Sequence, residues 1–407
     1  MLSDATLSYG RRAMTALLGV DALYRNESGD EDGLVVLNMD TEGRYAPDDF
    51  TRYGEARVCF EDLQADAASL PEADRRVYYD DLCRSTLAFI RWRQGGLSFK
   101  EQLGQFLHVP AESPADKELD GLRGTLRILL RTMGYSGDLA DQAAAWEERN
   151  RVPPEAVPEV LIEYLDEAWD RTEEHVFGIP VPKSDGMRVA AVSGVPYNAR
   201  CDYLARTIEL NVDPILTRPA LKHLAVHEGY PGHFLQFKMR ETMATDGLAA
   251  PDVLLSVVNT ASSSVFEGIA DCGVWATEWE DTDDDEIQSL LNLHRAGIGA
   301  GAAWRLHALE WPEEAVTDWM RDQALVGGEG WVANRMRFIS APSRAVLIWS
   351  YWWGQQSVTP VWQAVEPRDR LDFFYYLYGR MHSIRSVSMF AGPGTVPWER
   401  EEEPTWL

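Results

Sequence analysis

The chain has 407 residues, 45% of them hydrophobic and 25% charged, a composition typical of a folded globular protein rather than a disordered or fibrous one. Asp and Glu number 65 against 38 for Lys and Arg, so the formal net charge is -27. Such an acidic surface repels polyphosphate, and the sequence contains no concentrated basic stretch, so we expect no nucleic-acid partner.

The same composition bears on location. Only 5 of the basic residues are Lys, so the lysine-rich helices that bind membrane surfaces are not expected. Charged residues interrupt segment 1–24, which lacks the apolar core of a secretory signal. The four cysteines are widely spaced and include no CxxC pair, as is typical of reduced thiols. We therefore expect a cytoplasmic protein with no membrane partner.

The first half of the chain predicts helices separated by helix breakers, although its first 60 residues are weakly patterned. Helices are expected over 78–93, 98–107, 119–134 and 153–175. The first should end at Gly95-Gly96. The second opens with the Ser-x-x-Glu spacing of a capping box, from Ser98 to Glu101. The third carries leucines at helical spacing, which predicts one apolar face.

Glycine, proline and asparagine become frequent over 180–219, where 187–193 and 206–212 predict short strands. This change predicts a boundary between an N-terminal helical lobe, residues 1–185, and a C-terminal lobe, residues 186–407, within one continuous structural unit. Helical spacing then returns. Further helices are expected over 220–228, 233–243, 254–279, 284–309, 312–323, 343–356 and 368–389. The expected fold class is therefore mainly α.

Three of the eight histidines, His223, His227 and His233, lie within eleven residues. Neutral imidazoles and carboxylates are the ligands that zinc prefers, and Glu228 directly follows the second histidine. A Glu beside a ligand histidine can take a proton from a metal-bound water. The cluster therefore predicts one Zn²⁺ ion in the C-terminal lobe, with Glu228 as general base.

The spacing leaves open which histidine joins His227. Pro231 stands four residues after His227, where a regular zinc helix would carry its second histidine, so the helix must bend or end there. Gly229 and Gly232 would permit a tight turn that returns His233 to the same metal. Alternatively, His223 stands four residues before His227 and shares one helical face with it without any bend.

A third ligand is expected from another helix, and Glu267 is the best candidate. It lies among small residues that would let its helix approach the histidines closely. Asp271, one helical turn further, shares its face and could hold a ligand imidazole in the correct tautomer.

These motifs resemble those of the bacterial DUF885 family. The resemblance rests on HEGYPGHFLQ over 227–236, preceded by the 208–211 strand and followed by the segment 266–270. Further matches are 306–315 and 351–355, and the resemblance covers roughly 150 to 400. Departures from the family pattern are Phe234, Ile269, Cys272 and Val274, which put the substrate class in doubt more than metal binding.

The resemblance implies a large helical zincin-like fold, similar to gluzincins and Taq-type carboxypeptidases, with short strands that line the active-site cleft. It also implies His227, His233 and Glu267 as zinc ligands and Glu228 as base. The strand over 206–212, which contains Asn211, could then receive an extended peptide by backbone pairing.

Other residues are candidates for contacts with substrate. His307 could polarise a developing oxyanion, and Tyr351 could donate a hydrogen bond to it. Tyr378, His382 and Arg385 stand at helical intervals and could meet a substrate carboxylate.

The expected function is zinc-dependent hydrolysis, with a metallopeptidase that cleaves peptides or small amides as the first hypothesis. Two alternatives stay open. One is a metal enzyme that acts on a non-peptide small molecule, suggested by the altered positions around the metal. The other is a metal-free helical binding scaffold whose site has decayed.

Overall fold

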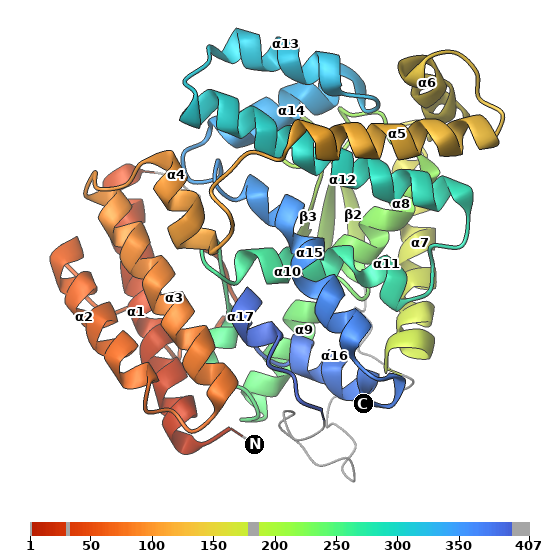
Figure 1. Cartoon of the computed structure of the whole chain (residues 1–407). Coiled ribbons are helices and arrows are strands. Elements are labelled where there is room, and N and C mark those ends of the chain that lie inside the picture. The colour runs from red at the N-terminus through yellow and green to blue at the C-terminus, as the bar shows by residue number, and fades with distance from the viewer. Residues whose placement is uncertain (1, 30–32, 178–186, 393–407) are drawn as a thin grey trace. The chain divides into compact units, whose positions relative to one another are not determined.

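The computed structural model of the chain describes residues 2–29, 33–177 and 187–392 and is mainly helical (Figure 1). The predicted mainly α fold class is thereby confirmed. Within these ranges, none of the helices combines the length and apolar character needed to cross a bilayer.

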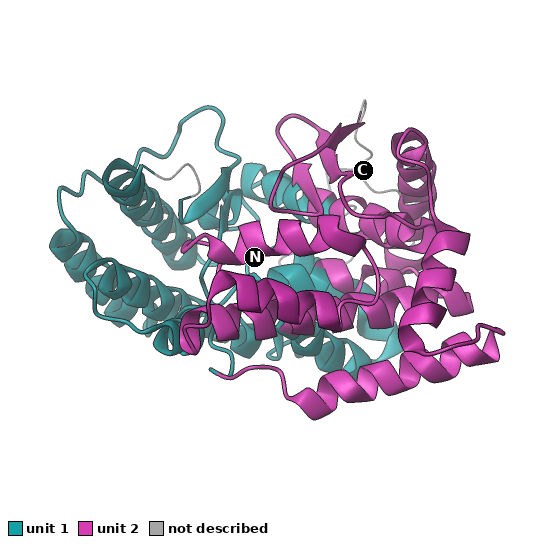
Figure 2. Cartoon of the chain, turned by 90° about the horizontal axis from the view of Figure 1, so that it is seen from above, with its two compact units in different colours: residues 1–111, 235–269, 353–407 teal, residues 112–234, 270–352 magenta. Residues whose placement is uncertain are grey.

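The chain divides into two compact units, each assembled from separate segments (Figure 2). Unit 1 comprises residues 1–111, 235–269 and 353–407, and unit 2 comprises 112–234 and 270–352. Both units therefore combine early and late segments, whereas the predicted lobes 1–185 and 186–407 follow chain order. Three helices run across the division: α9 (His233–Thr245), α10 (Ser263–Asp271) and α15 (Ile348–Ala364).

Unit 1 is built on the N-terminal helices. Its other helical elements are α1 (Asp4–Ser28), α2 (Tyr53–Ala67), α3 (Ala73–Arg93), α4 (Phe99–Gln102), η1 (Leu103–Leu107), η4 (Pro251–Leu254), η6 (Pro367–Asp369), α16 (Arg370–Tyr378) and α17 (Ile384–Val387). As predicted, α3 ends just before Gly95, whose φ of 78° suits only glycine well, and Ser98 and Glu101 form the capping box of α4. Strands β1 (Val35–Asn38) and β5 (Leu255–Val257) pair antiparallel.

Unit 2 holds the larger sheet. Its other helical elements are α5 (Asp116–Thr132), α6 (Leu139–Asn150), α7 (Val157–Arg171), η2 (Thr172–Phe177), α8 (Arg218–Leu224), η3 (Ala225–Gly229), α11 (Gly273–Ala276), α12 (Asp283–Ala303), η5 (Trp304–Ala308), α13 (Glu313–Gln323) and α14 (Gly328–Ser340). The leucine face predicted for α5 packs through Leu126 and Leu130 against Ile287 and Leu291 of α12. The apolar stripe of this helix was therefore predicted correctly.

The three-stranded sheet of unit 2 has the order β2 (Arg188–Val192), β4 (Thr207–Asn211), β3 (Ala199–Asp202). The two predicted strands are confirmed as β2 and β4. β4 pairs with β2 in parallel and with β3 antiparallel. Because both edges of β4 are occupied, the prediction that this strand receives a peptide by backbone pairing is wrong.

Two other predicted elements differ. The helix expected over 254–279 is instead η4, β5, α10 and α11, because the buried run that starts at Leu255 pairs with β1. The helix expected over 368–389 is broken between Tyr378 and Ile384. Tyr378, His382 and Arg385 therefore do not share one helix.

Candidate metal centre

The histidine segment lies where one helical run ends and the next begins. Thr217 caps α8 by accepting a hydrogen bond from the backbone N–H of Ala220 at 3.2 Å, and the helical run continues through η3 to Gly229. The predicted interruption at Pro231 is confirmed, and α9 starts at His233. Thus the two histidines flank a tight turn.

Gly232 makes that turn possible. Its backbone N–H donates to the carbonyl of Val226 at 2.9 Å. A Cβ at this position would collide with the carbonyl oxygens of Val226 and His227. Only glycine therefore lets the chain pass this close to η3, and this passage brings His233 back to His227.

The imidazoles of His227 and His233 meet edge to face, with ring centroids 4.6 Å apart, and both side chains are buried. The His223 ring lies further from His227, at 5.9 Å. All three histidines belong to unit 2.

Asp271, the last residue of α10, contacts two of these rings. Its Oδ1 lies 2.9 Å from Nδ1 of His227 and 3.7 Å from Nε2 of His223. Burial by itself would raise the pKa of Asp271, but His227 and His223 hold the pKa of this carboxyl well below its usual range. An ionised carboxylate at this distance accepts the Nδ1 proton, so the Nε2 lone pair of His227 is the one that can bind a metal.

The geometry bears on whether His223, His227 and Asp271 could together bind a metal ion. The ligand atoms of His223, His227 and Asp271 lie within 4.8 Å of one another, as a metal site would require. The direct hydrogen bond between Asp271 and His227 nevertheless occupies the space between those two groups. Glu267 belongs to unit 1 and precedes Asp271 by one turn of α10.

Glu228 is buried beside His227 and has a neighbour that sequence reasoning missed. Burial raises the pKa of the Cys201 thiol well above its usual value, and the charge of Glu228 adds to this effect. Cys201 belongs to β3, which packs against η3. A single cysteine 27 residues before Glu228 carries no sequence signal of this contact.

The remaining candidates of unit 2 hold other positions. His307 donates from Nε2 to the carbonyl of Ile339 at 2.7 Å, so a neutral ring would have to turn away to serve an oxyanion. Tyr351 packs edge to face on Phe338. Asn211 is buried, and its side-chain nitrogen donates to the carbonyl of Tyr197 at 3.0 Å. Its position therefore supports the loop before β3.

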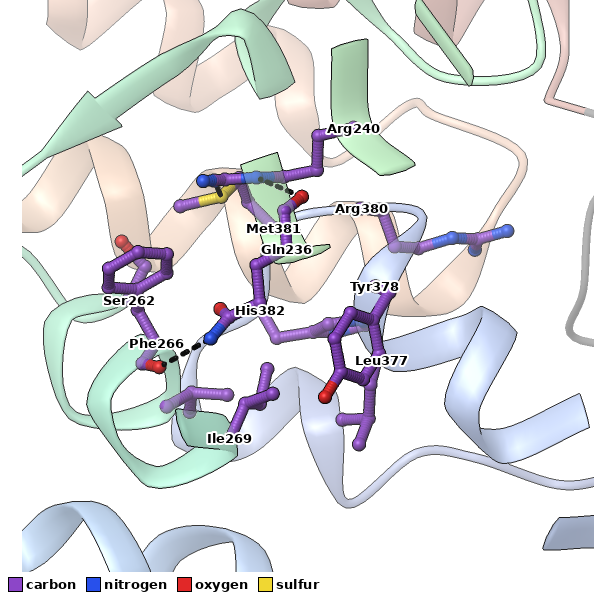
Figure 3. Close-up of a pocket in the computed structure, with 11 residues that line it drawn as sticks. Gln236, Arg240, Ser262, Phe266, Ile269, Leu377, Tyr378, Arg380, Met381 and His382 are labelled. Carbon is purple, nitrogen blue, oxygen red and sulfur yellow. Dashed lines mark hydrogen bonds between the residues drawn. The ribbon is translucent and has the colours of Figure 1, made fainter. Parts of the chain in front are cut away.

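Tyr378 and His382 meet in a pocket of unit 1, which Figure 3 shows together with Gln236 and Arg240. Burial lowers the pKa of His382 well below its usual value, and its Nε2 donates to the carbonyl of Tyr376 at 2.8 Å. Arg385 does not line this pocket, because it pairs with Asp81 at 2.7 Å.

The positions that depart from the DUF885 pattern lie in different surroundings. Phe234 packs against Tyr203 and Tyr230, with ring centroids 5.4 Å and 5.5 Å away. Ile269 lines the pocket of unit 1, and Cys272 is buried.

Comparison with known proteins finds a shared fold but no family. No protein-family model and no curated protein match the chain. The "putative lipoprotein from Colwellia psychrerythraea" matches with a TM-score of 0.56 and 13% identity, over 82% of this chain and 65% of its own. The "putative lipoprotein of unknown function from Shewanella oneidensis" matches with a TM-score of 0.50 and 12% identity, over 83% of this chain and 70% of its own. This chain thus spans less than two thirds of the first of these proteins, and at such low identities the likeness concerns the fold alone.

Proposed function

We propose that the chain is a zinc-dependent hydrolase, a metallopeptidase of the type that its resemblance to the DUF885 family implies. One observation carries the proposal. The Asp271 carboxylate lies 2.9 Å from Nδ1 of His227, and the ring centroids of His227 and His233 are 4.6 Å apart. This is the arrangement of a metal-ligand histidine oriented by a carboxylate.

The residues fit a zinc ion. His227 and His233 would be two ligands, and Glu267 the third, since residues four apart on a helix share a face and Asp271 of the same helix contacts His227. Two imidazoles and one carboxylate are a ligand set of catalytic zinc sites. His223 would share Asp271 with His227 rather than bind the ion.

Zinc in such a site supplies a bound water whose pKa falls to about 7. Glu228 would hold the proton of the attacking water and then deliver it to the leaving nitrogen of the substrate. Its carboxylate is buried next to His227 and beside Cys201, so few water molecules would compete for that proton.

Strand β3 is the element that could align an extended substrate. In the described part of the chain it pairs with β4 alone, and it packs against η3, which carries His227 and Glu228. A peptide could therefore add to its outer edge by backbone hydrogen bonds, in place of the β4 pairing that was expected.

The test is Glu228→Gln, with Glu278→Gln at an exposed position as the matched control. We expect the Glu228 variant to keep its zinc and lose turnover of peptide substrates, while the control keeps both. Unchanged hydrolysis by Glu228→Gln would refute the assignment. Turnover of amides or esters but of no peptide would favour the small-molecule hypothesis, and a protein that takes up no zinc would favour the scaffold. The cytoplasmic location stays a prediction.

A further inference from the structure

Helices α12 and α14 of unit 2 carry several buried polar side-chain atoms that lack hydrogen-bond partners among the described residues, although Nη2 of Arg295 donates to the carbonyl of Val326 at 3.4 Å. His294 is 1% exposed, and neither of its ring nitrogens has a partner. The same holds for Nε of Arg295, Nε1 of Trp331 and Nε of Arg335. Buried polar groups in native proteins are almost always hydrogen-bonded, so this concentration needs a physical reason.

The two arginines lie close to the same aromatic ring. The guanidinium carbon of Arg295 is 5.3 Å from the centroid of Trp331, and that of Arg335 is 5.9 Å from it. Arg335 also lies 5.5 Å from the Phe338 ring and 6.0 Å from Tyr351. Arg335 is half-buried, and its Nε has no hydrogen-bond partner among the described residues.

Charge in this region is unevenly balanced. Glu147 acts electrostatically on Arg295, and it also accepts a hydrogen bond from the backbone N–H of Gly327 at 2.5 Å. Burial, the largest cause, and the nearby Arg335 together lower the pKa of Arg295 to about 10, against the opposite effect of Glu147. Glu147 is the one carboxylate that acts on Arg295, and no described carboxylate acts on Arg335, so the positive charge of Arg335 is uncompensated.

We propose that Arg295 and Arg335, with Trp331 and His294, bind the carboxylate of a small organic acid. A planar guanidinium pairs with a carboxylate through two parallel hydrogen bonds. A single negative charge would compensate the Arg335 guanidinium. Phe338 and Tyr351 would pack against the apolar part of the acid. This site is independent of the zinc centre.

Burial, Arg123 and Arg295 together lower the pKa of His294 to about 4, while Arg123 is not among the charges that act on Arg295 or Arg335. At neutral pH the His294 ring is therefore uncharged and can donate one hydrogen bond to the bound acid. The excess positive charge thus comes from the arginines alone, and it persists across the neutral pH range.

The direct test is calorimetric titration of the full-length protein with sodium acetate, beside sodium chloride and inorganic phosphate at equal ionic strength. We expect saturable binding of one acetate per chain, weaker binding of phosphate, and no saturable heat with chloride. Absence of saturable acetate binding would overturn the proposal, and tighter binding of phosphate than of acetate would overturn the choice of a monoanion.

Variants locate the site. Arg335→Gln should weaken acetate binding at least tenfold, and Arg337→Gln, an exposed arginine on the same helix, should leave it unchanged. Arg335→Lys keeps the charge but loses the bidentate geometry, so it should bind acetate more weakly than the unaltered protein. This variant replaces Arg335→Gln in the test if Arg335→Gln does not fold. Unchanged acetate affinity in a folded Arg335 variant would overturn the assignment.

Discussion

Asp271→Asn tests whether this residue orients a metal ligand or binds the metal itself. The substitution removes the charge while keeping an oxygen that can accept the Nδ1 proton of His227. Asp271 is 20% exposed and its bond to His227 is 2.9 Å long, so the lost interaction is a largely buried, charge-assisted hydrogen bond. Such a bond contributes about 1.5–3 kcal/mol.

The expected result is a modest loss of zinc affinity. Partners that orient ligand histidines typically change metal affinity by about 10- to 100-fold, which corresponds to about 1.4–2.8 kcal/mol. This range agrees with the hydrogen-bond estimate. The measurement is a competition titration of zinc against a chromogenic chelator, with Asp318→Asn at an exposed site as control.

Two results would contradict this reasoning. Unchanged zinc affinity in Asp271→Asn would show that the carboxylate does not act on the metal site. Complete loss of zinc binding would instead indicate that Asp271 is itself a ligand, as in the set formed with His223 and His227.

Two further predictions concern stability. Burial raises the pKa of Asp252 to about 6, although Tyr79 donates a hydrogen bond to it. The contribution of the protonated carboxyl to the free energy of unfolding is therefore complete below about pH 4, and it falls by about 3 kcal/mol as pH rises through 6. Asp252→Asn should flatten this dependence in urea unfolding measured across that range, and an unaltered slope would argue against it. Gly232→Ala should cost about 1–3 kcal/mol and impair zinc uptake, because its Cβ would meet two backbone carbonyls. In Gly121→Ala of α5 the added Cβ would contact no other atom, so the free energy of unfolding should rise by up to about 1 kcal/mol. Equal unfolding midpoints for the two glycine variants would refute the packing argument.

Local rules predicted the helical part of the fold well where one signal dominated. The capping box at Ser98 and the leucine stripe of α5 act within one or two turns of the chain, and both appear as expected. The break at Pro231 follows from the missing backbone donor of proline. These features depend on neighbouring residues, which the sequence contains in full.

Features that depend on distant segments could not be predicted in this way. The run at Leu255 is buried on all sides, so its apolar residues suit a helix and a strand equally, and pairing with β1 decides between them. The central place of β4 depends on β3, a strand of only four residues whose pattern is too short to predict it. Helical spacing alone likewise suggested a shared face for Tyr378 and Arg385, which the break after α16 removes.

The same difference between features set by neighbouring residues and features set by distant segments applies to the candidate site. The motif around His227 and the turn before His233 could be recognised from residue types and spacing. The electrostatic effect of Glu228 on Cys201 and the unpaired atoms around Arg335 arise from tertiary packing, which brings together residues with no shared motif.

The most direct test of the account is a crystal of the zinc-loaded protein examined by anomalous scattering at the zinc edge. We expect one peak at about 2.0–2.1 Å from a nitrogen of His227 and of His233, with Glu267 as the third ligand. His223 and Asp271 should stay outside the coordination sphere. A peak coordinated by His223, His227 and Asp271, or no zinc at these histidines, would contradict the proposed centre.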